Sequence, residues 1–216
     1  MRSKLLLCGL LVLAVFARAL ASVALPAAAK DKDADAPNMI SAELIGQVYN
    51  PSPTVSAQYG YVSYLRGLDT SAITSPGGTL SERSALLTFY SDTVVERVIN
   101  NGPMRVIDRR GEATFYLNTT PGGDFGHPET LRKGVAVMAA SLRHQVVVDT
   151  LTGSFTAHFD CTVARNESFT INGASYRLGR PGQHFEITFS GHLNQQAPPS
   201  GYMAGYITGL ELRPTD

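Results

Sequence analysis

The sequence predicts an all-β protein: a single antiparallel β-barrel or closed β-sandwich that follows an N-terminal signal peptide. Short segments alternate apolar and polar residues, as in "AQYGYVSYL", "SFTAHFDCTV" and "HFEITFSGHL". Turn-forming residues separate such segments about every 8–12 residues, which is typical of sandwiches and barrels. No stretch has the 3.6-residue period of a long amphipathic helix, and only residues 129–133 suggest one helical turn.

The first residues resemble an export signal. Arg2 and Lys4 precede the apolar run Leu5–Phe16, which is too short to span a bilayer. Cys8 lies inside that run, where it is poorly placed for lipid attachment. A cleaved signal peptide is therefore favoured, and an uncleaved membrane anchor is the alternative.

Two candidate A-x-A cleavage motifs of small residues follow, at Ala19–Ala21 and Ala27–Ala29. Pro26 favours the second motif, because it would break the helix of the apolar run just before the cleavage point. The charged segment after it has the composition of a flexible leader. The predicted organisation is a signal peptide at 1–29, a flexible leader at 30–40 and an antiparallel barrel domain at 41–213.

The charge argues against binding to nucleic acids or anionic membranes, and the cysteine content argues against an internal disulfide. Removal of residues 1–29 leaves 15 basic against 18 acidic residues, so the mature chain lacks the positive charge that nucleic acids and anionic membrane surfaces attract. Cys161 is then the only cysteine, which excludes an internal disulfide. We expect a secreted or periplasmic protein with no transmembrane segment after signal cleavage.

The hairpin around "DTLTGS" gives the clearest register. With Leu151 and Thr152 at its tip, nearly every apolar residue of both strands falls on one face, and a slip of one residue would expose them. The expected cross-strand pairs are Val148–Phe155, Val146–Ala157, His144–Phe159 and Leu142–Cys161.

Three other turns follow from residue type. Asn172-Gly173 is the favoured pair for a two-residue hairpin, and Gly111 fits the left-handed position of a three-residue hairpin loop. Pro103 lacks an N–H group, which predicts a longer loop or a bulge at "INNGPM".

His144 and Cys161 are the catalytic candidates, because both face the predicted interior. An interior histidine can act as a general acid or base and a thiol as a nucleophile. The alternative is a buried histidine that is satisfied locally, and a cysteine that packs as a small apolar residue.

Two strands share the pattern histidine-apolar-acid, in "AHFDC" and "QHFEI". If these strands are neighbours, four metal-capable side chains lie on one outer face. The residues are His158, Asp160, His184 and Glu186. An ordinary solvated sheet face explains the same alternation, so no metal is assigned.

Two loops supply ligand-binding candidates. Asp124 and His127 belong to the glycine-rich segment 121–134, in which Asp124 and Glu129 alternatively cap backbone amides while Phe125 packs into the barrel end. Tyr202 and Tyr206 follow a proline-rich segment that also contains Gln195 and Gln196. They either line a polar mouth or fill the rim of the core.

Three stretches carry a resemblance: "RVINNGPMRVIDRRGEATFYL", "GDFGHPETLRKG" and "LRHQVVVDTLTGSFT". They look like a group of uncharacterised exported bacterial all-β proteins, over roughly residues 84–209. The string of strands is also similar in kind to the small barrels of the allene oxide cyclase and dirigent group. The resemblance implies export and β architecture, and it transfers no active residue.

The function expected from these observations is non-catalytic. An exported barrel that binds a small apolar molecule in its interior, or a partner at its loop end, is favoured, and no cofactor is expected. A barrel cyclase or isomerase that uses His144 is one alternative. A structural or surface-associated exported protein is another.

Overall fold

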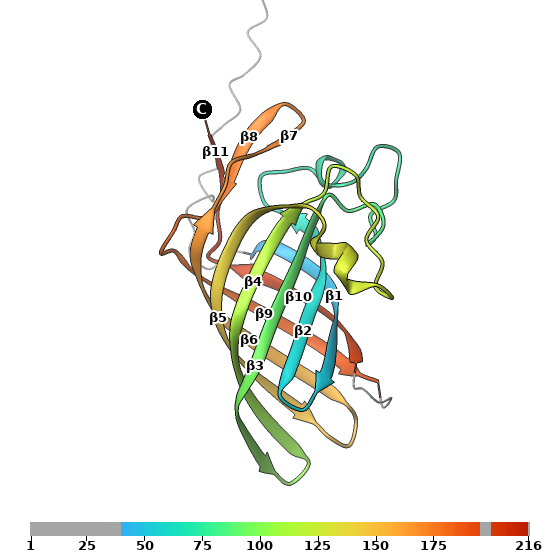
Figure 1. The fold of residues 1–216 in the computed structure, drawn as a ribbon, viewed down its shortest axis with the longest axis vertical. Helices are drawn as coiled ribbons and strands as arrows, with labels where there is room; N and C mark the ends of the chain where they lie inside the picture. The colour runs from blue at the N-terminus through green and yellow to red at the C-terminus, as the bar shows by residue number, and fades with distance from the viewer. Residues whose placement is uncertain (1–39, 195–199, 216) are drawn as a thin grey trace, which may run out of the picture. The chain divides into compact units, whose positions relative to one another are not determined.

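The computed structural model describes residues 40–194 and 200–215. It confirms the all-β class and selects the barrel over the sandwich: eight antiparallel strands close in the order β1-β10-β9-β6-β5-β4-β3-β2 (Figure 1). The strands are β1 (Ile40–Ser52), β2 (Val55–Leu65), β3 (Leu87–Asn101), β4 (Met104–Leu117), β5 (Val135–Asp149), β6 (Ser154–Asn166), β9 (His184–Leu193) and β10 (Ser200–Thr208).

Three short strands form a second sheet in the order β11-β8-β7. They are β7 (Phe169–Ile171), β8 (Ala174–Leu178) and β11 (Leu212–Pro214). Two 3-10 turns complete the described part, η2 (Thr70–Ile73) and η3 (Pro128–Arg132), the second at the one place where a helical turn was expected. In the described part of the chain, no helix has the length and apolarity needed to cross a membrane.

The expectations for the signal peptide, its cleavage site and most of the leader concern residues 1–39, which lie outside the described residues. The same holds for Gln195 and Gln196. The first described strand begins at Ile40 and the last ends at Pro214.

The barrel has two unlike ends. Three tight connections, β1–β2, β3–β4 and β5–β6, lie at one end, which we call the hairpin end (Figure 1), and β9 ends and β10 begins at the same end. The long connections 66–86 and 118–134 and the small sheet belong to the other, the loop end.

The register of the β5–β6 hairpin is confirmed. All four expected pairs are observed, from Val148–Phe155 to Leu142–Cys161. Their side chains are buried, whereas Arg143, Gln145 and His158 on alternate positions are exposed. The apolar pattern therefore does select the register, since a shift by one residue would turn every one of these side chains to the opposite face.

The turn expected at Asn172-Gly173 is confirmed, but the one at Gly111 is wrong. Asn172 and Gly173 have φ values of 50° and 81°, as a type I′ hairpin requires. Gly111 instead lies inside the continuous strand β4, opposite Thr93 of β3. A Cβ atom there would collide with the carbonyl oxygen of Asp92 and lie 2.9 Å from Thr93, so the glycine permits close strand approach rather than a turn.

The expectation of a longer loop at Pro103 is also wrong. Asn101 pairs directly with Met104, so only Gly102 and Pro103 form the loop. Gly102 has φ 57°, and the proline takes the second loop position, whose N–H group is not needed to close the hairpin. The bulge occurs further along, between Val95 and Arg97.

Phenylalanine rings fill the loop-end half of the barrel interior. Phe89, Phe115, Phe159 and Phe189 form a chain of ring contacts with centroid separations of 5.4–6.1 Å. Glycines on facing strands make room for them, since a Cβ on Gly60 would lie 2.8 Å from Phe89. Large and small residues thus complement each other across the barrel, as dense packing requires.

We predict that Gly60→Ala destabilises the barrel by about 1–3 kcal/mol, because the added methyl group overlaps the Ile45 carbonyl oxygen and the Phe89 ring. Urea unfolding measures the change. Gly122→Ala is the control, since a Cβ at Gly122 meets no atom within 4 Å. Equal stability of the two variants would contradict the packing argument.

Candidate functional site

A cavity opens at the hairpin end of the barrel. Its outer part, which we call the mouth, has a volume of about 550 Å³ and is contributed by the β1–β2 turn, β4, the β5–β6 turn and β9. Its walls include Pro51, Ile107, Val148 and Leu193. A smaller inner cavity of about 60 Å³ shares Ile107, Val148 and Leu193 with the mouth and continues toward Phe159. Among the described residues, these two cavities make the barrel interior hollow at its hairpin end.

Polar side chains lie at the junction of the two cavities. Arg109 of β4 and His144 of β5 are cross-strand neighbours, 7% and 4% exposed. Arg109 Nη1 lies 3.4 Å from His144 Nε2, and Arg109 Nη2 donates to Asn50 Oδ1 at 3.3 Å. The His144 ring meets Phe159 edge-on at a centroid distance of 4.3 Å, so the polar layer rests directly on the phenylalanine layer.

Burial determines the charge state of this pair. Burial first, and then the positive charge of Arg109, lowers the pKa of His144 to about 3, against a smaller opposing effect of Asp108. Burial and nearby Arg105 lower the pKa of Arg109 to about 10. At neutral pH the imidazole is neutral and the guanidinium remains charged. Because Arg109 donates to Nε2, the histidine proton belongs on Nδ1.

Cys161 shares the interior face with His144, as expected, but lies deeper among apolar residues. It is fully buried and pairs with Leu142 and Phe185. Burial raises the pKa of its thiol to about 12, which suppresses the nucleophilic thiolate. Cys161 does not line the mouth or the inner cavity, so the structure does not combine it with His144 in one site.

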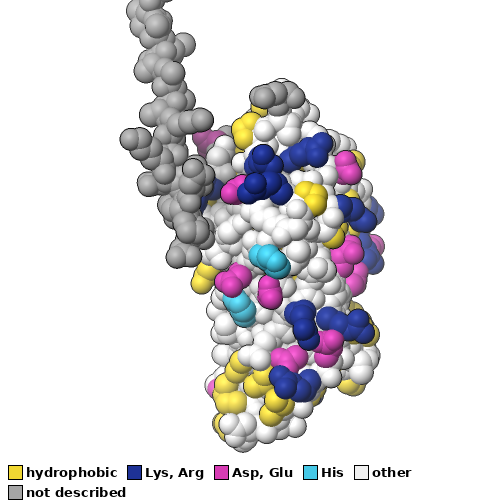
Figure 2. Space-filling model, turned by 90° about the vertical axis from the view of Figure 1, so that its left-hand side faces the viewer, with side chains coloured by type: hydrophobic (Ala, Val, Ile, Leu, Met, Phe, Trp, Pro, Cys, Tyr) yellow, Lys and Arg dark blue, Asp and Glu magenta, His cyan; other side chains and the backbone are white. Residues whose placement is uncertain are grey.

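The four metal candidates do lie on adjacent strands, because β6 pairs with β9. His158 Nε2 lies 3.8 Å from Glu186, and His184 Nδ1 lies 3.1 Å from the Thr162 hydroxyl. Asp160 is paired with Glu186 across the strands. Figure 2 shows one face of the molecule, where histidine side chains lie beside acidic ones. No group of three metal-capable residues converges anywhere among the described residues.

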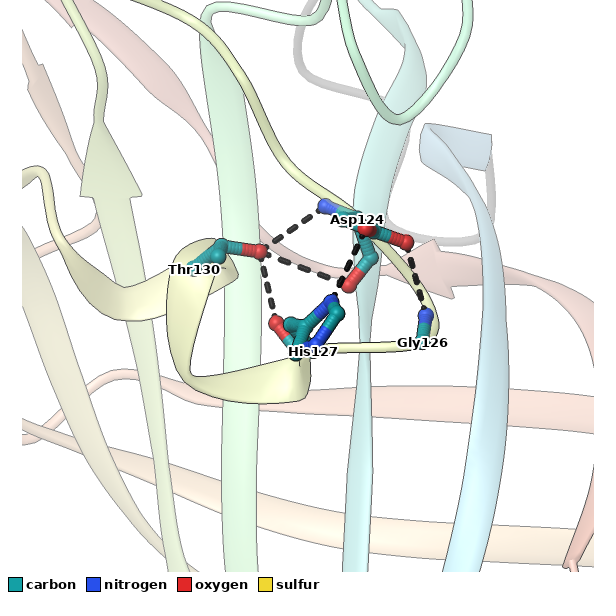
Figure 3. Close-up of polar contacts among 4 residues, drawn as sticks. All are labelled: Asp124, Gly126, His127 and Thr130. Carbon is teal, nitrogen blue, oxygen red and sulfur yellow. Dashed lines mark hydrogen bonds and ion pairs between the residues drawn. The ribbon is translucent and has the colours of Figure 1, made fainter.

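Within the segment 121–134, the side chains of Asp124, His127 and Thr130 are held by internal hydrogen bonds (Figure 3). Asp124 accepts from the Gly126 amide at 2.8 Å and contacts His127 Nδ1 at 3.0 Å. The Thr130 hydroxyl accepts from the Asp124 amide and donates to the His127 carbonyl. Asp124 thus caps an amide as expected, and Thr130 takes the bridging role in the turn.

The same segment packs on the outer surface of the barrel rather than into its end. The ring centroid of Phe125 lies 6.3 Å from that of Tyr59 and 6.2 Å from that of Tyr61. The Cζ atom of Arg132 lies 4.3 Å from the centroid of the Tyr90 ring. Tyr59 is only 3% exposed, and burial raises its pKa to about 12. The expectation for Phe125 is corrected: outward-facing tyrosines of β2 and β3 give it an apolar surface outside the barrel.

Tyr202 and Tyr206 lie on the outer face of β10, 62% and 41% exposed. They alternate with Met203 and Ile207, which are buried in the interior. The strand alternation therefore directs both tyrosines away from the cavity, and neither lines it.

Sequence reasoning identified His144 but missed Arg109. The false turn at Gly111 split β4 into two segments and assigned "IDRRGE" to a loop. As one strand, the inward series Ile107, Arg109, Gly111, Ala113 and Phe115 has period two, which would have placed an arginine in the interior. Comparisons with protein families, with curated proteins and with solved structures found no match to this chain.

We predict that His144 makes stability fall as the medium is acidified. The unfolded histidine takes up a proton below about pH 6.5, whereas the folded one stays neutral down to about pH 3, so its contribution is present above pH 6.5 and lost between these values. Urea midpoints of wild type should decrease more from pH 7 to pH 4 than those of His144→Gln. Parallel pH profiles would contradict this.

We predict a high titration midpoint for His127, because the hydrogen bond and charge of Asp124 raise the pKa of its imidazole. NMR of the ring protons should show a lower midpoint in Asp124→Asn than in wild type. Asp149→Asn, which removes a carboxylate at the opposite end of the barrel, is the control and should leave the His127 midpoint unchanged.

Proposed function

We propose that this barrel is an exported binding protein that takes up a small, largely apolar molecule through the mouth at its hairpin end. The observation that carries the proposal is the cavity of about 550 Å³, whose size is within the range of small-molecule sites. Ile107, Val148 and Leu193 give the mouth and the inner cavity a shared apolar wall, and polar side chains lie both at the junction of the two and around the rim. This combination is typical of sites in which apolar contact supplies affinity and few hydrogen bonds supply orientation.

The packed interior of the loop-end half also supports entry of the ligand from the hairpin end. Phe89, Phe159 and Phe189 occupy the interior toward the loop end, so a ligand approaching from that side meets packed rings. Figure 2 shows hydrophobic side chains gathered at the lower end of the molecule, the hairpin end in Figure 1. Val98, Ile99, Met104 and Leu151 of these hairpins are exposed. An apolar rim of this kind favours first contact with an apolar solute.

The enzyme alternative draws less support from the geometry. A general acid or base works best with a pKa near the operating pH, whereas burial holds His144 neutral over the whole physiological range. Its hydrogen-bonding partner is an arginine rather than a carboxylate that would raise its basicity. Binding requires no proton transfer and so fits this neutral imidazole better.

The proposal predicts that the neutral fluorescent probe N-phenyl-1-naphthylamine binds saturably, with increased emission. Val148→Phe places a larger side chain in the mouth and should weaken binding about tenfold or more. Val147→Phe is the matched control, since the adjacent residue faces outward and lines neither cavity. Absence of saturable uptake by wild type, or equal effects of the two variants, would contradict the proposal.

A further inference from the structure

We propose that the molecule bound in the mouth is a monocarboxylate with an apolar tail, and that its carboxylate pairs with Arg109. This inference rests on the proposed function and adds the chemical class of the ligand. It follows from a buried charge without a counter-ion, from the sizes of the two cavities and from the charges that line them.

Arg109 is a buried cation without an acidic partner. The residue is only 7% exposed, yet it takes part in none of the ion pairs formed among the described residues. The neighbouring Arg110 on the outer face, by contrast, lies 3.0 Å from Glu96. The guanidinium of Arg109 instead contacts two neutral side chains, those of His144 and Asn50. An isolated buried charge is costly, and a hydrogen-bonded anion would offset part of that cost.

Unpaired polar atoms mark the same place. Arg109 Nε, His144 Nδ1 and Gln58 Oε1 are buried without a hydrogen-bonding partner. The first two are donors, as a carboxylate requires. Gln58 Nε2 donates to Ser56 at 2.6 Å, and a 180° rotation of the amide would turn its NH₂ group to the cavity while Ser56 donates to the oxygen. The inner cavity can then offer donors from three side chains.

The cavity volumes determine the orientation of the ligand. The inner cavity of about 60 Å³ holds about four waters, which suits a carboxylate but not an alkyl chain of several carbons. The mouth of about 550 Å³ accommodates the tail along Ile107, Val148 and Leu193. Arg109 lines both cavities and therefore meets the head group at their junction. The ligand enters head first.

The charges of the lining favour a single negative charge. Arg105 and Arg109 are the charged residues that line the two cavities, and none of their described lining residues is acidic. Arg105 is exposed at the rim, so water screens it, and one buried guanidinium remains. A planar carboxylate matches a guanidinium with two parallel hydrogen bonds. A dianionic phosphate would leave one charge uncompensated among apolar side chains.

The test compares octanoate with 1-octanol, which share a tail and differ in the head group. Calorimetric titration of the purified protein should give an affinity about 10–100-fold higher for octanoate, the range expected for hydrogen bonds to a charged group. Arg109→Met should abolish that preference and leave octanol affinity within about twofold, because the tail contacts are unchanged. Octanoate should raise the melting temperature of wild type more than octanol does, whereas the two compounds should raise that of this variant equally.

The matched control is Arg110→Gln, which removes the next arginine along β4 from the outer face and should retain the preference for octanoate. Arg109→Lys is the second variant: it keeps the charge and should retain part of the preference even if Arg109→Met folds poorly. Equal affinity of wild type for octanoate and octanol would overturn the anion assignment while the proposed function stands. Binding of neither compound, together with no uptake of N-phenyl-1-naphthylamine, would overturn both. Loss of preference in Arg110→Gln alone would place the anion outside the barrel and overturn the inference.

Discussion

The structure depends on the limited width of an eight-stranded barrel. Closure leaves an interior that is just wide enough for side chains to fill or for one small ligand to enter. In the loop-end half, Phe89 and Phe189 occupy that space because Gly60 and Gly205 face them. In the hairpin-end half, Phe155 packs against Gly191, and shorter side chains such as Val148 and Ile107 leave space beside it. The location of the cavity thus follows from where large and small side chains face one another across the barrel.

The sequence predicts the barrel well where alternation is strong. Along β5 and β6, every second residue is apolar, and burial of that face permits one register, so His144 and Cys161 were assigned to the interior correctly. Along β4 the pattern is weaker, because arginines and a glycine interrupt it. Gly111 has the residue type of a turn, yet its role is to let Asp92 and Thr93 approach, a tertiary contact that a single strand does not reveal. Arg109 was missed for this reason.

The segment 121–134 shows a second limit of sequence reasoning. Its cluster of Asp124, His127 and Thr130 resembles a site in sequence, but these side chains satisfy one another and shape a turn. Its surroundings are also non-local: Phe125 packs on Tyr59 of β2, more than sixty residues earlier in the chain. Local residue types therefore identified the polar contacts but not the barrel surface against which the segment packs.

The phenylalanine layer has a consequence for exchange between the cavity and its surroundings. The inner cavity ends at Phe159, whose ring packs against Phe189. The cavity is therefore open to solvent at the hairpin end and closed by packed rings on its inner side. Under the proposed function, a bound molecule would leave through the mouth by which it entered. Residues of the β1–β2 and β5–β6 turns, such as Pro53 and Thr150, border that route.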